Sequence, residues 1–181
     1  MQKAILLLLI TIALAAIVVT TAAGTTASRS RAARQGSTRV GLEDRILVVL
    51  NRTRIRHGLV PLRLNSALAA SSVQHSREMG MQGYFAHTSP SGTNLWQRIV
   101  PQYDPGGNAS FAIGENLLWS SPTIRALAAM RAWMASPEHR TNILSPRWRE
   151  VGVGAVRFAN APGVFGGLPV TIITTDFGVR D

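Results

Sequence analysis

The sequence contains no cysteine, and only 15% of its 181 residues are charged. Without cysteine, a disulfide scaffold, a cysteine-ligated zinc finger, an iron–sulfur site, a thiol nucleophile and a lipidated N-terminal cysteine are all excluded. Internal repeats at a spacing of about 20–50 residues are also missing, which argues against a solenoid or a propeller. Hydrophobic residues, in contrast, make up 46% of the chain. A chain of this composition and length is expected to fold as one domain with a substantial core.

Lysine occurs only once, at Lys3, so arginine carries nearly all of the net charge of +10. The arginines are unevenly distributed: residues 24–57 contain eight with two acidic residues, and residues 58–181 contain ten with seven acidic residues. A strongly basic protein would suggest a nucleic-acid partner. Because most of the excess charge lies in a short N-terminal stretch, we predict no nucleic-acid partner for this protein.

The first 23 residues have the pattern of a secretion signal, with a basic start, an apolar run and small residues before Gly24. We therefore predict a signal peptide at residues 1–23, cleaved after Ala23 or Ala27, and a secreted, extracellular protein. The alternative is an uncleaved N-terminal anchor in the cell envelope, because about 20 apolar residues are enough to cross a bilayer. The arginines that follow the run make export less favourable, since positive charge ordinarily stays on the cytoplasmic side.

Residues 24–40 are mainly Gly, Ser, Thr, Ala and Arg, with almost nothing to bury. This composition predicts a basic flexible linker. Coulomb attraction would allow such a segment to make weak contact with an anionic envelope surface. The folded domain is then expected at residues 41–181, as a monomer.

Hydrophobic periodicity predicts helices in the first two thirds of the domain and strands in the last third. In the third of these helices, we expect Leu127, Met130 and Met134 to face the core. In the first helix, Val48 and Ile55 lie opposite the main apolar side, which suggests that this helix is covered on both flanks. Helices followed by strands predict an α+β fold with helices packed on an antiparallel sheet. The expected helices are 42–57, 66–82 and one that begins with Ser121-Pro122 and ends at Ser136-Pro137; the expected strands are 113–119, 150–158 and 170–177.

Four histidines are candidates for a functional role. His75 lies on the apolar row of the second helix, which indicates a core histidine that is hydrogen-bonded to a neighbour. His87 follows aromatic residues in a loop, and His139 lies at the start of a helix, where binding sites are often built. Glu115 is the third candidate, because two imidazoles and one carboxylate suit Zn²⁺ or a similar divalent ion. The three are 28 and 24 residues apart, so their spacing alone does not establish a shared site.

Five segments in order resemble the CAP superfamily, also called the SCP-like extracellular or PR-1-like domain: YFAHTSPSG, GEN, RAWMASPEHRTNIL, REVGVG and TTDFG. The resemblance covers residues 42–178 and is nearest to the bacterial secreted branch that lacks disulfides. It implies a three-layer α–β–α sandwich with a central antiparallel sheet, placement outside the cell and a central cleft. In many members two histidines and two acidic residues line this cleft, and some members bind divalent cations there.

The resemblance places His87 and His139 at the two family histidines and Glu115 at the glutamate of the GEN motif. The fourth position differs, because Ser136 stands about where plant and animal members have a second glutamate. Glu138 is a possible substitute, and Glu150 is a more distant one. With one carboxylate fewer, the site is expected to bind a divalent cation such as zinc only weakly.

Three functions follow from this comparison. The favoured one is a secreted binding module rather than an enzyme, whose cleft, formed by His87, Glu115, Ser136, Glu138 and His139, holds a divalent cation or a small ligand. The first alternative is a metal-dependent hydrolase in which His87 and His139 bind the metal and Glu115 is the general base. The second is an extracellular lipid- or sterol-binding protein, which would need an apolar groove or a flexible loop, such as residues 103–112. No sequence feature requires turnover, and a fold alone does not specify a reaction.

Overall fold

The computed structural model describes residues 37–180 with the exception of residues 39, 105 and 108–110. The predicted signal peptide at residues 1–23 and most of the predicted linker therefore lie outside the described residues. At the end of that linker, β1 (Ser37–Thr38) pairs with β4, and α2 begins at Val40. Within the described part of the chain, no helix combines the length and the apolar character needed to cross a membrane.

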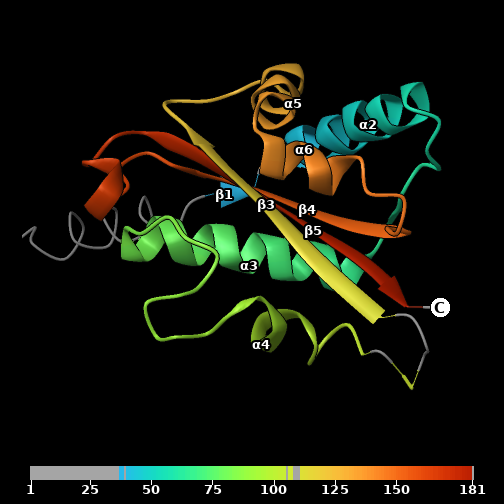
Figure 1. Cartoon of the computed structure of the whole chain (residues 1–181). Helices are drawn as coiled ribbons and strands as arrows, with labels where there is room; N and C mark the ends of the chain where they lie inside the picture. Colours follow the sequence, from blue (N-terminus) through green and yellow to red (C-terminus); the bar gives the residue numbers. More distant parts are fainter. Residues whose placement is uncertain (1–36, 39, 105, 108–110, 181) are drawn as a thin grey trace, which may run out of the picture.

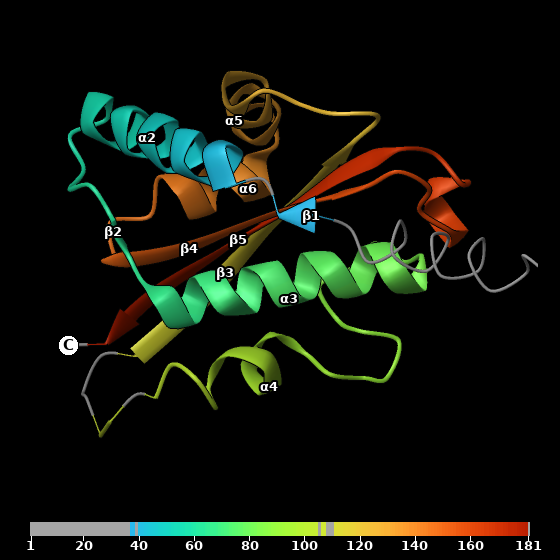
Figure 2. The same ribbon diagram turned by 180° about the vertical axis from the view of Figure 1, so that it is seen from behind.

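The domain has three layers, with a mixed sheet between two layers of helices (Figure 1). The sheet has the strand order β1–β4–β5–β3 and is antiparallel except for β2, which pairs in parallel with β4. Helices α2, α5 and α6 cover one face, and α3 and α4 cover the other, as the view from behind also shows (Figure 2). The α+β class and the predicted sandwich are thus confirmed. The bounds are α2 (Val40–Arg56), β2 (Arg63–Leu64), α3 (Ser66–Gln82), α4 (Leu95–Ile99), β3 (Phe111–Ser120), α5 (Ala126–Ala135), α6 (Pro137–Ile143), β4 (Glu150–Phe158) and β5 (Val170–Arg180).

Helix α3 packs directly on the sheet because small residues lie on both sides of the contact. A Cβ atom at Gly154 of β4 would lie 2.4 Å from the carbonyl carbon of Ser72, and one at Gly152 would lie 2.0 Å from that of Leu68. Neither position has space for a larger residue. The side of α3 that carries His75, with Leu68, Ser72 and Met79, is buried throughout.

The predicted start of the third helix is wrong. The Ser121–Pro122 bond is cis and lies before the helix, and α5 begins at Ala126 after Arg125, which has an extended backbone. Its buried face is centred on Trp133, whose indole nitrogen donates to the carbonyl oxygen of Leu117 over 3.1 Å. Leu127, predicted to be in the core, is instead 62% exposed, because packing around the tryptophan sets the rotation of the helix.

The predicted cover on both flanks of α2 is also wrong. Val48 is 48% exposed and Ile55 is 58% exposed. One side of α2 packs on the core through Leu42, Ile46 and Leu50, which are buried. The other side of the helix faces solvent.

Buried Arg54 connects the ends of α2 and α6. Its guanidinium donates to the carbonyl oxygens of Ile143 over 2.7 Å, Ser145 over 2.9 Å and Val60 over 3.0 Å. Burial lowers the pKa of Arg54, and the neighbouring charge of Arg149 adds to this effect. Because the last carbonyl of α6 is held in this way, the end of the helix that carries His139 is fixed relative to α2.

Candidate functional site

The candidate site lies at the β3 edge of the described sheet, where side chains from both helical layers approach one strand. Consecutive residues of a strand face opposite sides of the sheet. Glu115 accordingly faces the layer of α3 and α4, while Asn116 faces α6. The GEN motif therefore contacts both helical layers at this edge of the sheet.

Both carboxylate oxygens of Glu115 are engaged. Its Oε1 lies 2.6 Å from His87 Nδ1, and its Oε2 accepts a hydrogen bond from Arg98 Nη2 over 2.6 Å. The side chain of Glu115 is only 1% exposed. Burial would raise the pKa of Glu115, but the hydrogen bond from His87 and the charges of His75 and Arg98 outweigh it, so the pKa is lowered. Glu115 is therefore a buried carboxylate that is held ionised.

His87 is the exposed member of this pair. Its side chain is 58% exposed, and its backbone oxygen accepts a hydrogen bond from Arg98 Nη1 over 2.7 Å. Arg98 therefore holds both the loop that carries His87 and the carboxylate that orients its ring. With Nδ1 committed to Glu115, Nε2 is the ring nitrogen left for an incoming ligand.

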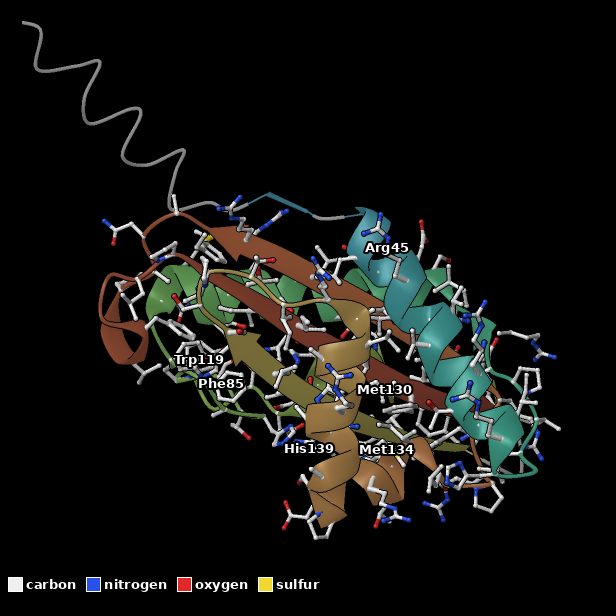
Figure 3. All side chains as sticks on the ribbon, turned by 90° about the horizontal axis from the view of Figure 1, so that it is seen from above. Arg45, Phe85, Trp119, Met130, Met134 and His139 are labelled. Carbon is white, nitrogen blue, oxygen red and sulfur yellow. The ribbon has the colours of Figure 1, made fainter. Side chains whose placement is uncertain are left out.

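His139 approaches the same edge from the other layer and lies half-buried in the first turn of α6 (Figure 3). Burial lowers the pKa of His139, and the nearby charge of His87 lowers it further, while Glu138 acts in the opposite direction. The two imidazoles thus approach the β3 edge from opposite helical layers, close enough for the charge of His87 to affect the pKa of His139. Ser136 is half-buried just before α6, and Glu138 is exposed in its first turn.

Two asparagines fix the position of α6 relative to the strand. Asn116 donates to the backbone oxygen of His139 over 3.0 Å, and Asn142 donates to Asn116 Oδ1 and to the Glu115 backbone oxygen, each over 3.0 Å. Trp148 in turn donates to the backbone oxygen of Asn142 over 2.9 Å. The glycine of the motif leaves room for that indole, because a Cβ at Gly114 would lie 2.9 Å from the Trp148 ring.

Three site residues were missed in the sequence: Arg98, Glu78 and Asp176. Nothing distinguishes Arg98 locally, since a single arginine in a short helix ordinarily faces solvent. Asp176 did have a signal, because it is an acidic residue within the apolar, β-branched strand 170–177. It is completely buried and is the register partner of Glu115 between β3 and β5.

Asp176 lies behind Glu115 in an environment that disfavours a negative charge. Burial and the charge of Glu115 raise its pKa well above the usual range. The hydroxyls of Ser71 and Ser72 lie close enough to lower this pKa in part. Among the described residues, however, no group forms a hydrogen bond of standard geometry with either carboxylate oxygen of Asp176. The direction of the shift indicates that Asp176 holds a proton when Glu115 is ionised.

His75 and Glu78 lie beside this pair. His75 Nε2 donates to the backbone oxygen of Ala86 over 3.0 Å and lies 3.9 Å from Glu115 Oε2, which confirms the predicted core histidine with a bonded neighbour. Burial lowers the pKa of His75 despite the nearby acids. Ser89 donates to Glu78 Oε2 over 2.9 Å, and Tyr84 donates to Ser89 over 3.2 Å. Burial raises the pKa of Tyr84 to about 12.

The predicted cation ligands do not form a complete set as they stand. Within residues 37–180, leaving out those not described, no three His, Asp or Glu side chains converge closely enough to hold a metal ion together. The structure brings His87 and Glu115 into contact and places His139 nearby. Both oxygens of Glu115 are used by neighbouring side chains.

The fold is thus an α–β–α sandwich with a histidine–carboxylate pair and a second histidine at the open edge of its sheet. Residues 47–169 match the model of the CAP family, described as the cysteine-rich secretory protein family. The chain belongs to this family, although it has no cysteine.

Two Bacillus subtilis proteins are similar in sequence. YkwD is 31% identical over 114 residues, which cover 63% of this chain and 42% of YkwD. The membrane protein YlbC is 30% identical over 116 residues, which cover 64% of this chain and 32% of YlbC. The chain thus spans less than half the length of these relatives.

Solved structures give the same fold. An extracellular protein with an SCP domain from Bacillus anthracis superposes with a TM-score of 0.59 at 27% identity, covering 78% of this chain and 41% of the other. An outer surface protein from Borrelia burgdorferi has a TM-score of 0.61 at 19% identity, covering 81% of this chain and 99% of the other. Both are described as proteins of the cell exterior.

Proposed function

We propose that this domain is a secreted binding module whose site is the β3 edge, with His87 and His139 as the residues that contact the ligand. One observation carries the proposal: the exposed ring of His87 is bonded through Nδ1 to the buried carboxylate of Glu115 over 2.6 Å. A histidine that ligates a metal commonly has its other ring nitrogen bonded to a carboxylate in this way. The bond fixes the tautomer and directs Nε2 outward.

The donor set fits a weakly held divalent cation. Two imidazole nitrogens suit zinc or a similar borderline ion, with water or a small ligand completing the coordination. Ser136 and Glu138 precede His139 and would supply further oxygen atoms at the rim. Glu115 would orient His87 rather than ligate the ion, because both of its oxygens are engaged. This role differs from the sequence-based expectation that Glu115 is a ligand.

Zinc titration by calorimetry tests the proposal. We expect saturable, weak binding by the parent protein and its loss in the double variant His87→Ala/His139→Ala. His57→Ala is the matched control, because His57 is exposed at the end of α2 and bonded to the backbone of that helix. Equal binding by the parent and the double variant would show that the two histidines do not form the site.

The geometry does not favour the hydrolase. A general base must reach the proton that it abstracts, whereas the Glu115 side chain is 1% exposed and has a hydrogen bond to each oxygen. We expect no metal-dependent turnover of peptide or ester substrates. Turnover that is lost in Glu115→Gln would reverse this conclusion.

The lipid or sterol alternative depends on the loop 103–112, part of which lies outside the described residues. At the start of this loop, Tyr103 is buried and donates to Glu150 Oε2 over 2.5 Å. Its first residue is therefore part of the core. Sterol binding that is unaffected by the two histidine substitutions would support this alternative.

A further inference from the structure

The two helical layers differ in charge. Residues 40–56 and 125–143, which form the layer of α2, α5 and α6, contain seven arginines and three acidic residues, whereas residues 66–104 on the other face contain two of each. Six of the seven arginines are exposed, and only Arg54 is buried. The positive charge of the folded domain is therefore concentrated on one of its two broad faces.

The same face exposes large aliphatic side chains. Val48 and Ile55 on α2 are 48% and 58% exposed, and Leu127 on α5 is 62% exposed. Helical spacing places Arg52 next to both Val48 and Ile55 on the surface of α2, and it places Arg131 next to Leu127 on α5. Each exposed aliphatic residue thus has an arginine beside it.

Helices α2 and α5 form one continuous surface. A groove of about 260 Å³ between them is lined by apolar Val49, Met130 and Met134 and by the arginines Arg52, Arg56 and Arg131. Figure 3 looks onto this face and shows Met130 and Met134 on the side of α5 that is turned toward α2. We call the surface formed by the exposed sides of these two helices the α2–α5 face.

We propose that the α2–α5 face docks onto the surface of an anionic lipid bilayer. Basic side chains near such a surface each contribute about 1 kcal/mol of attraction, and exposed aliphatic side chains can enter the layer just below the headgroups. A soluble polyanion would engage the arginines but leave Val48, Ile55 and Leu127 in water. Only a bilayer presents a negative surface with an apolar phase directly beneath it.

The sequence before α2 has the same character. Arg29, Arg31, Arg34 and Arg39 precede the helix, with no acidic residue among residues 1–42. The segment that precedes α2 in the sequence therefore carries a charge that suits the same surface. The proposal is independent of the histidine site, which lies at the β3 edge.

The lack of cysteine provides a direct test on the full chain. Ile55→Cys and Leu127→Cys would each be labelled with an environment-sensitive fluorophore, with Met81→Cys as the control. Met81 is 46% exposed on α3, in the opposite layer. With phosphatidylglycerol vesicles we expect a blue shift at positions 55 and 127 and none at position 81. Phosphatidylcholine vesicles should give no shift at any position.

A second experiment reverses charges in the protein that is labelled at Ile55→Cys. Arg52→Glu/Arg131→Glu should weaken vesicle binding by at least ~30-fold, the effect of losing two basic contacts. Arg63→Glu/Arg77→Glu changes the net charge equally and should have little effect, because both residues are exposed and lie on the opposite side, Arg77 on α3 and Arg63 as the register partner of Glu150. Circular dichroism checks that both variants are folded.

Four results would overturn the proposal. No shift with any vesicle excludes docking, and equal shifts at all three positions mean that the N-terminal segment inserts without a preferred face. Equal shifts at positions 55 and 127 with neutral and anionic vesicles would remove the electrostatic basis. A shift without vesicles that grows with protein concentration shows that a second copy of the chain covers the face.

Discussion

Arg98 and Glu115 form a 2.6 Å salt bridge in which the two side chains are only 4% and 1% exposed. Arg98 comes from α4, and its second nitrogen donates to the backbone oxygen of His87. One guanidinium therefore neutralises the carboxylate and holds the loop whose histidine that carboxylate orients. The placement of His87 therefore depends on a residue that is itself buried.

Arg98→Ala should destabilise the domain by about 3–5 kcal/mol, because removing one partner of a buried pair leaves the other charge uncompensated. Urea unfolding measures this loss. Arg77→Ala is the control, since Arg77 is exposed on α3, and a surface change of this kind should stay within about 0.5 kcal/mol. Similar midpoints for the two variants would show that the buried pair contributes nothing to stability.

Asp176→Asn should stabilise the protein at neutral pH. It should also make the free energy of unfolding depend less on pH. Burial raises the folded-state pKa of Asp176 well above that of an aspartate in the unfolded chain. As the pH rises above the unfolded-state pKa, the unfolded chain releases a proton that the folded state keeps. The free energy of unfolding therefore falls with rising pH until the folded-state pKa is reached. Asparagine does not titrate, so this decline should be absent.

Thermal unfolding between about pH 3 and pH 8 measures the effect, because this range begins below the ordinary aspartate pKa. Asp44→Asn is the matched control, because Asp44 is exposed on α2, and its profile should follow that of the parent. A steeper decline in Asp176→Asn than in the parent would contradict the assignment.

Gly154→Ala should destabilise the domain by about 1–3 kcal/mol, the usual effect of overpacking a core. Its Cβ would lie 2.4 Å from the backbone of Ser72, which cannot move without shifting α3. The matched change is Gly41→Ala on α2, where no atom lies within 4 Å of the new Cβ. Chemical denaturation should show a large loss for the first variant and none for the second.

Most of the fold could be predicted from the sequence, because local patterns indicate the helices and strands and the five segments that resemble the CAP superfamily occur in the family's order. The strands at 150–158 and 170–177 alternate clearly, Asn65, a residue type that favours helix starts, caps α3, and the resemblance supplied the layer order. The start of α5 could not be predicted, because Ser121-Pro122 has the same local pattern at a helix start and at the turn found here. The rotation of α5 depends on Trp133, whose hydrogen-bond partner lies on a strand distant in the sequence.

The candidate site was predictable only in part. His87 and Glu115 were identified by motif, and they do meet. Arg98 could not be found, because its burial depends on two partners, His87 and Glu115, that are 11 and 17 residues away. A pairing between distant residues has no local pattern, so the identity of the group that neutralises Glu115 required the structure.

Asn116→Ala should weaken zinc binding by displacing His139. Asn116 is completely buried, donates to the backbone oxygen of His139 and accepts from Asn142. Its loss removes the donor to the backbone oxygen of His139 and leaves Asn142 Nδ2 with the Glu115 backbone oxygen alone, at a cost of about 1–3 kcal/mol. The first turn of α6 would then be free to move away from β3. The pKa of His139, now lowered by burial and by His87, should rise toward its ordinary value.

The pKa of His139, followed by NMR, separates a positioning role from a purely structural one. Thr141→Ala is the control: its hydroxyl bonds only within α6, to the backbone oxygen of Pro137 over 2.8 Å, so it should leave the pKa unchanged. If Asn116→Ala loses stability but keeps both the lowered pKa and the zinc affinity, Asn116 stabilises the fold without positioning His139. If the pKa rises and the affinity falls together, the asparagine pair determines how closely the two histidines approach, because no other described side chain bonds to the backbone of His139 from the strand.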